Sequence, residues 1–370
     1  MRKNILILFS FCFAFTCCIK ESSWNPGMPM PKEKIKIAVI HPNEINQNSF
    51  YDNAHYEGIL EMQRIMGLKD SQIIRKVNVF DADPEVAEGL IRDCIAEGAN
   101  IIIATSWGYM SALEKLSTAF PQVIFVHATG NKHNNQNFTS YMIRLYQARY
   151  LSGIIAGMKT KTGKIGFVAA MGKDNSEVSS AINAFAIGVE EVNPEAKVFV
   201  RITHSWYDPM GETDAANTLL SAGCDVIAAH SNTVMPQIAA EKAGAWSIGY
   251  NSDMRIYAPD SVITSVIPRW GVIYTNFAKS LISGNFKPAS YLYGVKENAI
   301  DISPLNMKLA EPEMDAAVNA GRERIKAGFN VFDGLLKTND GRTVGEEGKT
   351  LSDEIILGGI NWYYHNITEM

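Results

Sequence analysis

Residues 101–128 read IIIATSWGYMSALEKLSTAFPQVIFVHA. Two runs rich in β-branched residues, 101–104 and 123–128, enclose a stretch at 110–119 with the length and periodicity of a helix. Apolar runs without alternation are typical of strands buried on both faces, as in parallel sheets covered by crossover helices. This stretch therefore predicts a strand–helix–strand unit of an α/β fold.

The same alternation continues in both directions along the chain. Further strands are expected at 35–40, 73–79, 165–170, 198–203, 226–230, 246–250 and 262–266. Further helices are expected at 53–66, 84–96, 146–158, 176–192, 212–222, 235–243 and 271–283. Strands that alternate with helices of this length predict parallel sheets.

About ten strands are too many for one small open sheet, so the chain forms either an eight-stranded barrel or two sheets. Two similar halves, 35–130 and 150–250, favour two lobes. We expect an N-terminal lobe of 35–145 plus about 252–284 and a C-terminal lobe of 146–251 plus about 285–370. In two such lobes the strand ends face a shared cleft, where α/β sheets bind ligands.

The N-terminus has the pattern of an export signal. Arg2 and Lys3 precede an uncharged apolar run at 5–15, which is too short for a membrane span and has the length of a signal-peptide core. Cys17 and Cys18 follow, and the pattern indicates a lipoprotein signal over 1–18 with Cys18 (or Cys17) lipidated; a plain secretory signal is the alternative. Residues 19–34 are rich in Pro, Ser and charge, which is typical of a tether.

Composition and motifs argue against several classes of protein. The net charge is −5 over 370 residues, so nucleic-acid binding is not expected, and five cysteines do not form a disulfide framework. The sequence has no G-x-S-x-G, G-x-G-x-x-G, H-x-x-x-H or C-x-x-C motif. Asp81 and Asp83 precede Pro84 and are better explained by helix capping than by a calcium site. We therefore expect no catalytic residues, no cofactor and no metal.

Aromatic and polar residues stand at the expected strand-to-helix junctions. They are Phe50, Tyr51, Trp107, Tyr109, Trp206, Tyr207, Asn232, Asn251, Asp253 and Trp270. Two aromatic rings that face each other across a cleft can sandwich a flat heterocycle, and stacking of this kind contributes about 1–3 kcal/mol per base. The alternative is that each ring covers the core of its own lobe.

Several of these stretches resemble the basic membrane protein family of lipoproteins, which includes purine nucleoside receptors of ABC importers. They are NSFYDNAHYEG (48–58), IIIATSWGYM (101–110), YQARYLSGIIAG (146–157), HSWYDPMGETDAANTL (204–219), YNSDMRIYAP (250–259) and LSDEIILGGINWY (351–363). The resemblance covers roughly residues 35–365. The W-Y-D-P, S-D-M and N-W-Y segments are most similar to a branch of the family that binds purines. The resemblance implies two Rossmann-like lobes joined by a hinge, the type I periplasmic-binding fold.

The resemblance also implies a set of ligand-binding residues. A purine would stack between Tyr51 (with Phe50 as the alternative) and Trp206, and the ligand-binding aspartate would be Asp253. Asn232 stands where an acidic residue is common, and no lysine matches the one that meets ribose near Pro268. These two departures favour a free base over a nucleoside. Ser106, Trp107 and Trp270 are expected as further cleft residues.

The expected function is that of a monomeric solute receptor, lipid-anchored on the extracytoplasmic or periplasmic face of the cell membrane. It would capture a purine base or nucleoside and deliver it to an ABC permease complex. Two other functions remain open. A secreted nucleoside hydrolase-like enzyme would need paired carboxylates or a metal in the cleft, and a surface adhesion lipoprotein would expose an aromatic patch.

Overall fold

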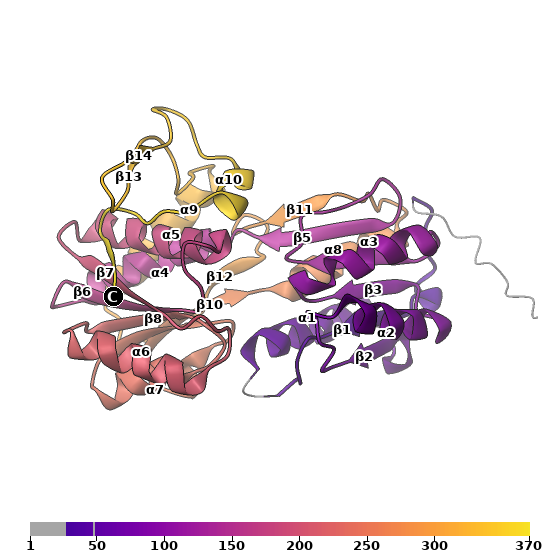
Figure 1. Ribbon diagram of the computed structural model, residues 1–370, viewed down its shortest axis with the longest axis horizontal. Helices are drawn as coiled ribbons and strands as arrows, with labels where there is room; N and C mark the ends of the chain where they lie inside the picture. The colour runs from indigo at the N-terminus through magenta and orange to yellow at the C-terminus, as the bar shows by residue number, and fades with distance from the viewer. Residues whose placement is uncertain (1–26, 47–48) are drawn as a thin grey trace, which may run out of the picture.

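The structure is a computed structural model that describes residues 27–46 and 49–370. Its elements form two α/β lobes that lie end to end along the long axis (Figure 1). The expected signal peptide at 1–18, with Cys17 and Cys18, lies outside the described residues. The last part of the expected tether packs on the first lobe, because Met30 is buried and its N–H donates to the carbonyl of Leu281 at 2.9 Å.

The first lobe is a parallel six-stranded sheet in the order β11-β5-β4-β3-β1-β2. Its strands are β1 Ile37–Ile40, β2 Ile73–Lys76, β3 Ile101–Ala104, β4 Ile124–Ala128, β5 Phe138–Ile143 and β11 Ser290–Tyr293. Its helices are α1 Phe50–Met66, α2 Pro84–Ala96, α3 Met110–Ala119 and α8 Trp270–Ile282. The short 3-10 helices η1 Lys32–Lys34, η2 Asp70–Gln72 and η3 Trp107–Tyr109 complete it.

Both faces of this sheet are covered, which explains the continuous apolar runs. Along β1, Ile37 and Val39 face a core shared with α1 and α8, whereas Ala38 and Ile40 face a core shared with α2 and α3. Successive side chains of a strand point to opposite faces, so a strand buried on both sides must be apolar at every position.

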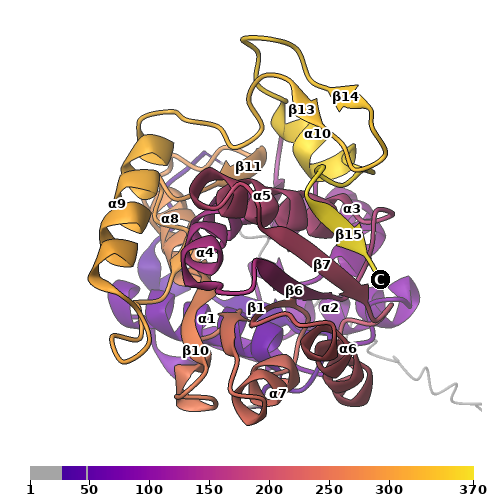
Figure 2. The ribbon, with the colours of Figure 1, turned by 90° about the vertical axis from the view of Figure 1, so that its left-hand side faces the viewer.

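The second lobe has a seven-stranded sheet in the order β12-β10-β9-β8-β6-β7-β15, with only β12 antiparallel to its neighbour. Its strands are β6 Lys164–Ala169, β7 Lys197–Ile202, β8 Val226–His230, β9 Trp246–Tyr250, β10 Val262–Pro268, β12 Ile300–Ile302 and β15 Ile367–Glu369. Its helices are α4 Leu145–Lys159, α5 Ser176–Val192, α6 Pro209–Ser221, α7 Met235–Lys242, α9 Pro312–Lys326 and α10 Asp353–Gly358, with η4 Met254–Ile256. A hairpin of β13 Leu336–Lys337 and β14 Thr343–Val344 extends beyond α10 (Figure 2).

Helices α4 and α5 cover one face of the second sheet, and α6 and α7 cover the other (Figure 2). The first two pack with their backbones close together, because glycine stands at the crossing. A Cβ atom on Gly153 would lie 2.1 Å from the carbonyl oxygen of Phe185, and one on Gly188 would lie 2.2 Å from that of Tyr150. This contact fixes the crossing of α5 and α4, in the second half of α5.

The chain crosses between the lobes three times: at Arg144 between β5 and α4, at Arg269 between β10 and α8, and at 294–299 between β11 and β12. These crossings differ from the boundaries expected near 252 and 284. Strand β10 stays in the second sheet because it pairs in parallel with β9, and β11 joins the first sheet beside β5. The second visit to the first lobe therefore runs from about 269 to about 294.

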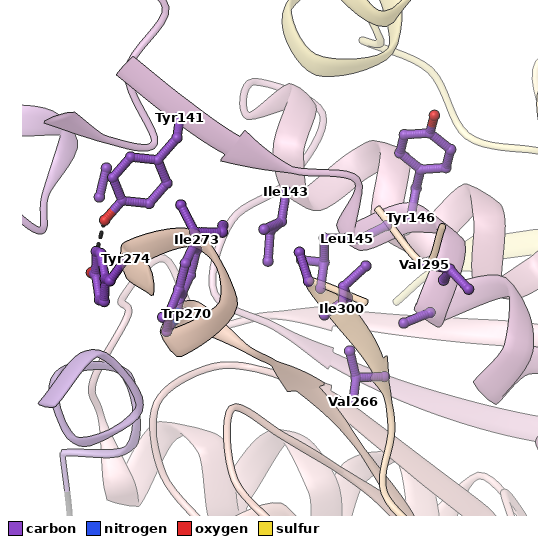
Figure 3. Close-up of a cluster of buried hydrophobic side chains, with 14 of the residues drawn as sticks. Tyr141, Ile143, Leu145, Tyr146, Val266, Trp270, Ile273, Tyr274, Val295 and Ile300 are labelled. Atoms are coloured by element: carbon purple, nitrogen blue, oxygen red, sulfur yellow. Dashed lines mark hydrogen bonds between the residues drawn. The ribbon is translucent and has the colours of Figure 1, made fainter. Parts of the chain in front are cut away.

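One hydrophobic cluster fills the region of the crossings (Figure 3). It joins Tyr141 of β5, Leu145 of α4, Val266 of β10 and Tyr274 of α8, and the hydroxyls of Tyr141 and Tyr274 are hydrogen-bonded at 2.8 Å. The eight-stranded barrel that the strand count left open does not form, because the strands divide into two separate sheets.

Candidate functional site

The first-lobe half of the candidate site lies where the strand order changes direction. In the order β2-β1-β3-β4-β5, helix α1 follows β1 on one face and α3 follows β3 on the other. Ligands of such sheets bind beyond the carboxyl ends of these two strands. Tyr51 at the start of α1 and Thr105 after β3 meet at this point, where the Tyr51 hydroxyl donates to the Thr105 carbonyl at 2.6 Å.

A buried carboxylate fixes the start of α1. Asp52 is fully buried and accepts hydrogen bonds from Ser49 Oγ at 2.8 Å and Asn43 Nδ2 at 3.0 Å. Burial alone would raise the pKa of Asp52, but its neighbours His41, Asn43 and Ser49 lower it overall. The ionised carboxylate therefore ties α1 to the loop after β1 and holds the adjacent Tyr51 at the strand ends.

The second lobe repeats this arrangement between β6 and β8. In the order β7-β6-β8-β9-β10, α5 begins beyond β6 and Asn232 follows β8. The loop after β8 is held by buried Glu212, which accepts from Ser231 Oγ at 2.7 Å and Thr233 Oγ1 at 2.6 Å. Asn232 is thereby placed at the carboxyl edge of its sheet, opposite the start of α1.

Asn232 connects the two lobes and is hydrogen-bonded to the backbone of both expected stacking residues. Its Oδ1 accepts from the backbone N–H of Tyr51 at 3.1 Å and from Asn251 Nδ2 at 3.2 Å. Its own backbone N–H donates to the carbonyl of Trp206 at 2.9 Å. Tyr51 from the first lobe and Trp206 from the second are therefore both bonded to one residue at the junction of the lobes.

Aromatic rings line the second-lobe side of the junction. Trp206 is 39% exposed, and its ring meets that of His230 edge-on, with centroids 5.9 Å apart. His230 in turn meets Tyr250 at 4.6 Å. Burial, with the charge of Arg149, lowers the pKa of His230 well below its usual value, so the imidazole is neutral.

Asp253 already has a cationic partner in the structure. It caps η4, and its carboxylate pairs with the guanidinium of Arg255, with Arg255 Nε 2.8 Å from Asp253 Oδ1. Hydrogen bonds from Arg255 lower the pKa of Asp253. The carboxylate is 35% exposed, so a ligand would share it with Arg255.

The other expected residues occupy different environments. Phe50 is buried in a small cluster with Met254, Ala258 and Val262 of the second lobe. Trp270 is buried and stacks on His55 with centroids 4.3 Å apart, so its ring belongs to the packing between α1 and α8. Trp107 is 55% exposed. Ser106 donates to the carboxylate of Asp81 through its hydroxyl.

Two charged residues at the junction were not expected from the sequence. Arg149 is fully buried in α4, and Glu177 lies in the first turn of α5 beside the β6/β8 strand ends. A signal for Arg149 was present, because it is the only charged residue in the otherwise uncharged run YQARYLSGIIAG. Glu177 gave no such signal, since an acidic residue in the first turn of a helix is common.

Three further observations bear on the site. A cavity of about 490 Å³ lies at the crossings, lined among others by Arg144, Tyr146 and Asp353, and none of the expected ligand residues lines it. Within residues 27–46 and 49–370, no group of three or more His, Cys, Asp or Glu could hold a metal ion. Over the same part of the chain, no helix is long and apolar enough to cross a membrane.

Comparison with known proteins assigns the chain to a family. A family model described as ABC transporter substrate-binding protein, PnrA-like, matches residues 34–338. A purine-binding protein of Brucella abortus is 32% identical over 352 residues, covering 93% of this chain and 95% of that protein. A putative ABC transporter glucose-binding protein of Haloferax volcanii is 34% identical over 213 residues, covering 58% of this chain and 54% of that protein.

The fold agrees with that of solved solute-binding proteins. An ABC transporter solute-binding protein from Conexibacter woesei superposes with a TM-score of 0.67 at 22% identity, covering 80% of this chain and 97% of that chain. This confirms the expected two-lobed periplasmic-binding fold. The family consists of binding proteins and not of enzymes, as the lack of catalytic motifs predicted. The chain belongs to the PnrA-like family of ABC transporter substrate-binding proteins, the family that its sequence resemblance indicated.

Proposed function

We propose that this protein captures a purine, as a free base or a nucleoside, between its two lobes and delivers it to an ABC importer from a lipid anchor. The observation that carries the proposal is the meeting of Tyr51 and Trp206 at Asn232, where each lobe contributes one aromatic residue. The purine-binding relative, which matches 93% of the chain, supports the same ligand class.

The chemistry of the junction suits a flat, polar ring. Stacking on an aromatic face contributes about 1–3 kcal/mol and accepts any base, while hydrogen-bonding groups around the ring select among bases. Asn232 Oδ1 accepts hydrogen bonds from Tyr51 and Asn251, but Asn232 Nδ2 has no hydrogen-bond partner among the described residues and can donate to a ring nitrogen or carbonyl of a ligand. Binding between the lobes would stabilise the closed arrangement over an open one.

A panel of ligands tests the proposal. Thermal unfolding of the mature protein would be measured with purine bases, purine nucleosides, pyrimidines and hexoses, and hits would be followed by titration calorimetry. We expect stabilisation by at least one purine, since a ligand at a hundred times its Kd adds about 2.7 kcal/mol to the free energy of unfolding. A response to hexoses with none to purines would contradict the proposal.

A sugar is the second candidate ligand, and the glucose-binding relative favours it. Thermal unfolding with hexoses and with purines distinguishes a sugar-binding protein from a purine-binding protein. Incubation with inosine and adenosine, followed by chromatography for free base, separates binding from hydrolysis. An adhesive role would depend on exposed rings such as Trp107 and Tyr207, and would leave the thermal stability unchanged by every small molecule.

The anchor is tested on the chain itself. Expression of the whole sequence in a bacterial host should give a membrane-associated protein whose N-terminal peptide carries acyl chains on Cys18, and Cys18→Ser should release it. Cys17→Ser serves as the matched control. Acylation at neither cysteine, with the protein recovered in the soluble fraction, would favour a plain secretory signal.

A further inference from the structure

Arg149 is a buried cation with unused hydrogen-bond donors. It is fully buried, and only its Nη2 has a partner, the carbonyl of Ala229 at 2.9 Å. Its Nε and Nη1 have no hydrogen-bond partner within the described residues. The guanidinium carbon lies 4.5 Å from the centroid of Tyr250 and 5.3 Å from that of Phe167. Leaving buried donors unpaired is costly, so such groups point to a partner that completes them.

Glu177 is a half-buried carboxyl with no protein partner. In the part of the chain that the structure describes, its carboxylate has no hydrogen-bond partner and no cation within 4.0 Å. Burial raises the pKa of Glu177 to about 7, while the charge of Arg149 acts in the opposite direction. The two side chains are thus close enough to affect each other's ionisation, but they do not form an ion pair.

The groups around Glu177 come from four elements. Arg149 lies on α4 and Tyr250 at the end of β9, while His230, at the end of β8, lies close to Arg149. Tyr51 comes from α1 of the first lobe, and burial and the charge of Glu177 raise the pKa of Tyr51. His230 is fully buried, and both of its ring nitrogens lack a partner among the described residues. On the loop before α5, Asp174 accepts from the N–H of Gly172 and Lys173 pairs with Glu369.

Glu177 and Arg149 therefore place an acceptor and unused donors together, close to Tyr51 of the first lobe and Tyr250 of the second. Resting on the proposed function above, we propose that these two residues bind the polar edge of the ligand. The carboxylate of Glu177 accepts a hydrogen bond from a ligand N–H, and Arg149 donates to the neighbouring ring nitrogen or carbonyl oxygen. The ligand class is a planar heterocycle that presents an N–H beside an acceptor, as a lactam or an amino-imine edge does.

This arrangement makes binding depend on pH in one direction. An N–H of the ligand donates to the ionised carboxylate, so binding favours the deprotonated form of Glu177. With a pKa of about 7 in the free protein, the affinity is highest above pH 7. It falls as the pH drops, by up to about tenfold per unit, because one proton must be released on binding.

The test compares Glu177→Gln with a control variant that removes the same charge at a position away from the site. Titration calorimetry would use hypoxanthine and adenine between about pH 5.5 and about pH 8, a range that spans the pKa of about 7 of Glu177. Glu177→Gln should bind at least about tenfold more weakly at pH 8 and should lose the pH slope. Glu195→Gln, in the exposed loop after α5, should retain the affinity and the slope of the natural protein.

The outcomes separate this inference from the proposed function. If the natural protein binds a purine but Glu177→Gln keeps the same affinity and pH slope, the inference is overturned and the function stands. An affinity that rises on acidification also overturns it, because a protonated Glu177 would then be the donor. If no purine binds the natural protein, the proposed function itself fails.

Methylated ligands provide a readout that needs no variant. With the natural protein, methylation at one of the ring N–H positions of hypoxanthine should weaken binding by at least about tenfold and abolish the pH slope. Methylation at the other position should leave the slope in place. If every methylated analogue keeps the slope and the affinity, no ligand N–H donates to Glu177.

Discussion

Tyr51 and Trp206 are held by different contacts. A substitution at one of them would therefore disturb the surrounding structure more than a substitution at the other. The Tyr51 hydroxyl and backbone N–H are both hydrogen-bonded, so its loss would also disturb the strand ends of the first lobe. Trp206 is hydrogen-bonded to Asn232 only through its backbone carbonyl, and the residue is 39% exposed. Trp206 is therefore the cleaner probe of stacking.

Replacing Trp206 by Ala should weaken purine binding about tenfold to a hundredfold, because one stacking face of about 1–3 kcal/mol is lost. The midpoint of thermal unfolding without ligand should change little, since the ring is partly exposed. Titration calorimetry measures the first quantity and calorimetric melting the second. Trp206→Phe is the control and should keep most of the affinity, whereas unchanged binding by Trp206→Ala would reject the stacking role.

Glu177 should also affect stability in the absence of ligand. The pKa of Glu177 is raised to about 7 in the folded protein, above its value in an unfolded chain. At pH values between these two pKa values the folded state therefore binds more protons than the unfolded state. The free energy of unfolding contributed by Glu177 therefore falls as the pH rises from about 4.5 to about 7. Glu177→Gln should stabilise the protein more at pH 8 than at pH 5, by thermal or urea unfolding. Glu195→Gln should show no such difference between the two pH values.

Of the residues that the structure brings together at the candidate site, the sequence analysis named those that follow strand ends and missed those that come from helices. Tyr51, Trp206 and Asn232 follow predicted strands, and parallel strands bring their carboxyl ends to one edge. Arg149 enters from the side of α4, and no local pattern tells which helix face meets a strand end. The pairing of Asp253 with Arg255 depends on the turn of η4, and the burial of Trp270 depends on contact between α1 and α8.

Among the elements, the strands and helices of the core were predictable and the peripheral pieces were not. Runs such as 101–104 are apolar at every position, so they stand out as strands. Strand β5 was not expected, because Thr139 and Ser140 interrupt its apolar pattern, and their side chains are satisfied by hydrogen bonds to the β11 region. The two-residue strands of the β13–β14 hairpin are too short for any periodicity.

The close crossing of α4 and α5 makes a test of packing. Gly188→Ala would place a Cβ atom 2.2 Å from the carbonyl oxygen of Tyr150, so the two helices must separate. We expect a loss of about 1–3 kcal/mol in the free energy of unfolding, measured by urea titration. Gly89→Ala in α2 is the matched control, because its Cβ would meet nothing within 4 Å. That control should be neutral or stabilising, by up to about 1 kcal/mol, since Ala favours a helix more than Gly does. Equal effects at the two positions would show that the crossing does not depend on glycine.

The two lobes touch directly at the site, although only three segments connect them at the hinge. The Tyr51–Asn232 hydrogen bond and the burial of Phe50 both cross the junction. In the proposed hinge motion, contacts of this kind would form on closing and break on opening, and would therefore set the balance between the two arrangements. The alternation of strands and helices and the number of lobes followed from the sequence, but this balance did not, because it depends on contacts between side chains far apart in the chain.

Phe50 provides the test of that balance. Its ring meets Tyr257 of the second lobe edge-on at 5.5 Å, and it is 3% exposed in the structure. Burying a side chain of this size contributes about 1.5–3 kcal/mol, and this contribution exists only while the lobes are closed. Phe50→Ala should therefore increase the radius of gyration of the free protein in small-angle scattering, and purine should restore the smaller value. Affinity should fall about tenfold, because a smaller fraction of the protein is in the binding-competent state.

Ile65→Ala, on the exposed part of the same helix, should change neither the radius of gyration nor the affinity. If Phe50→Ala lowers the affinity with no change in the radius, Phe50 contacts the ligand instead, which is the alternative stacking residue that the sequence left open.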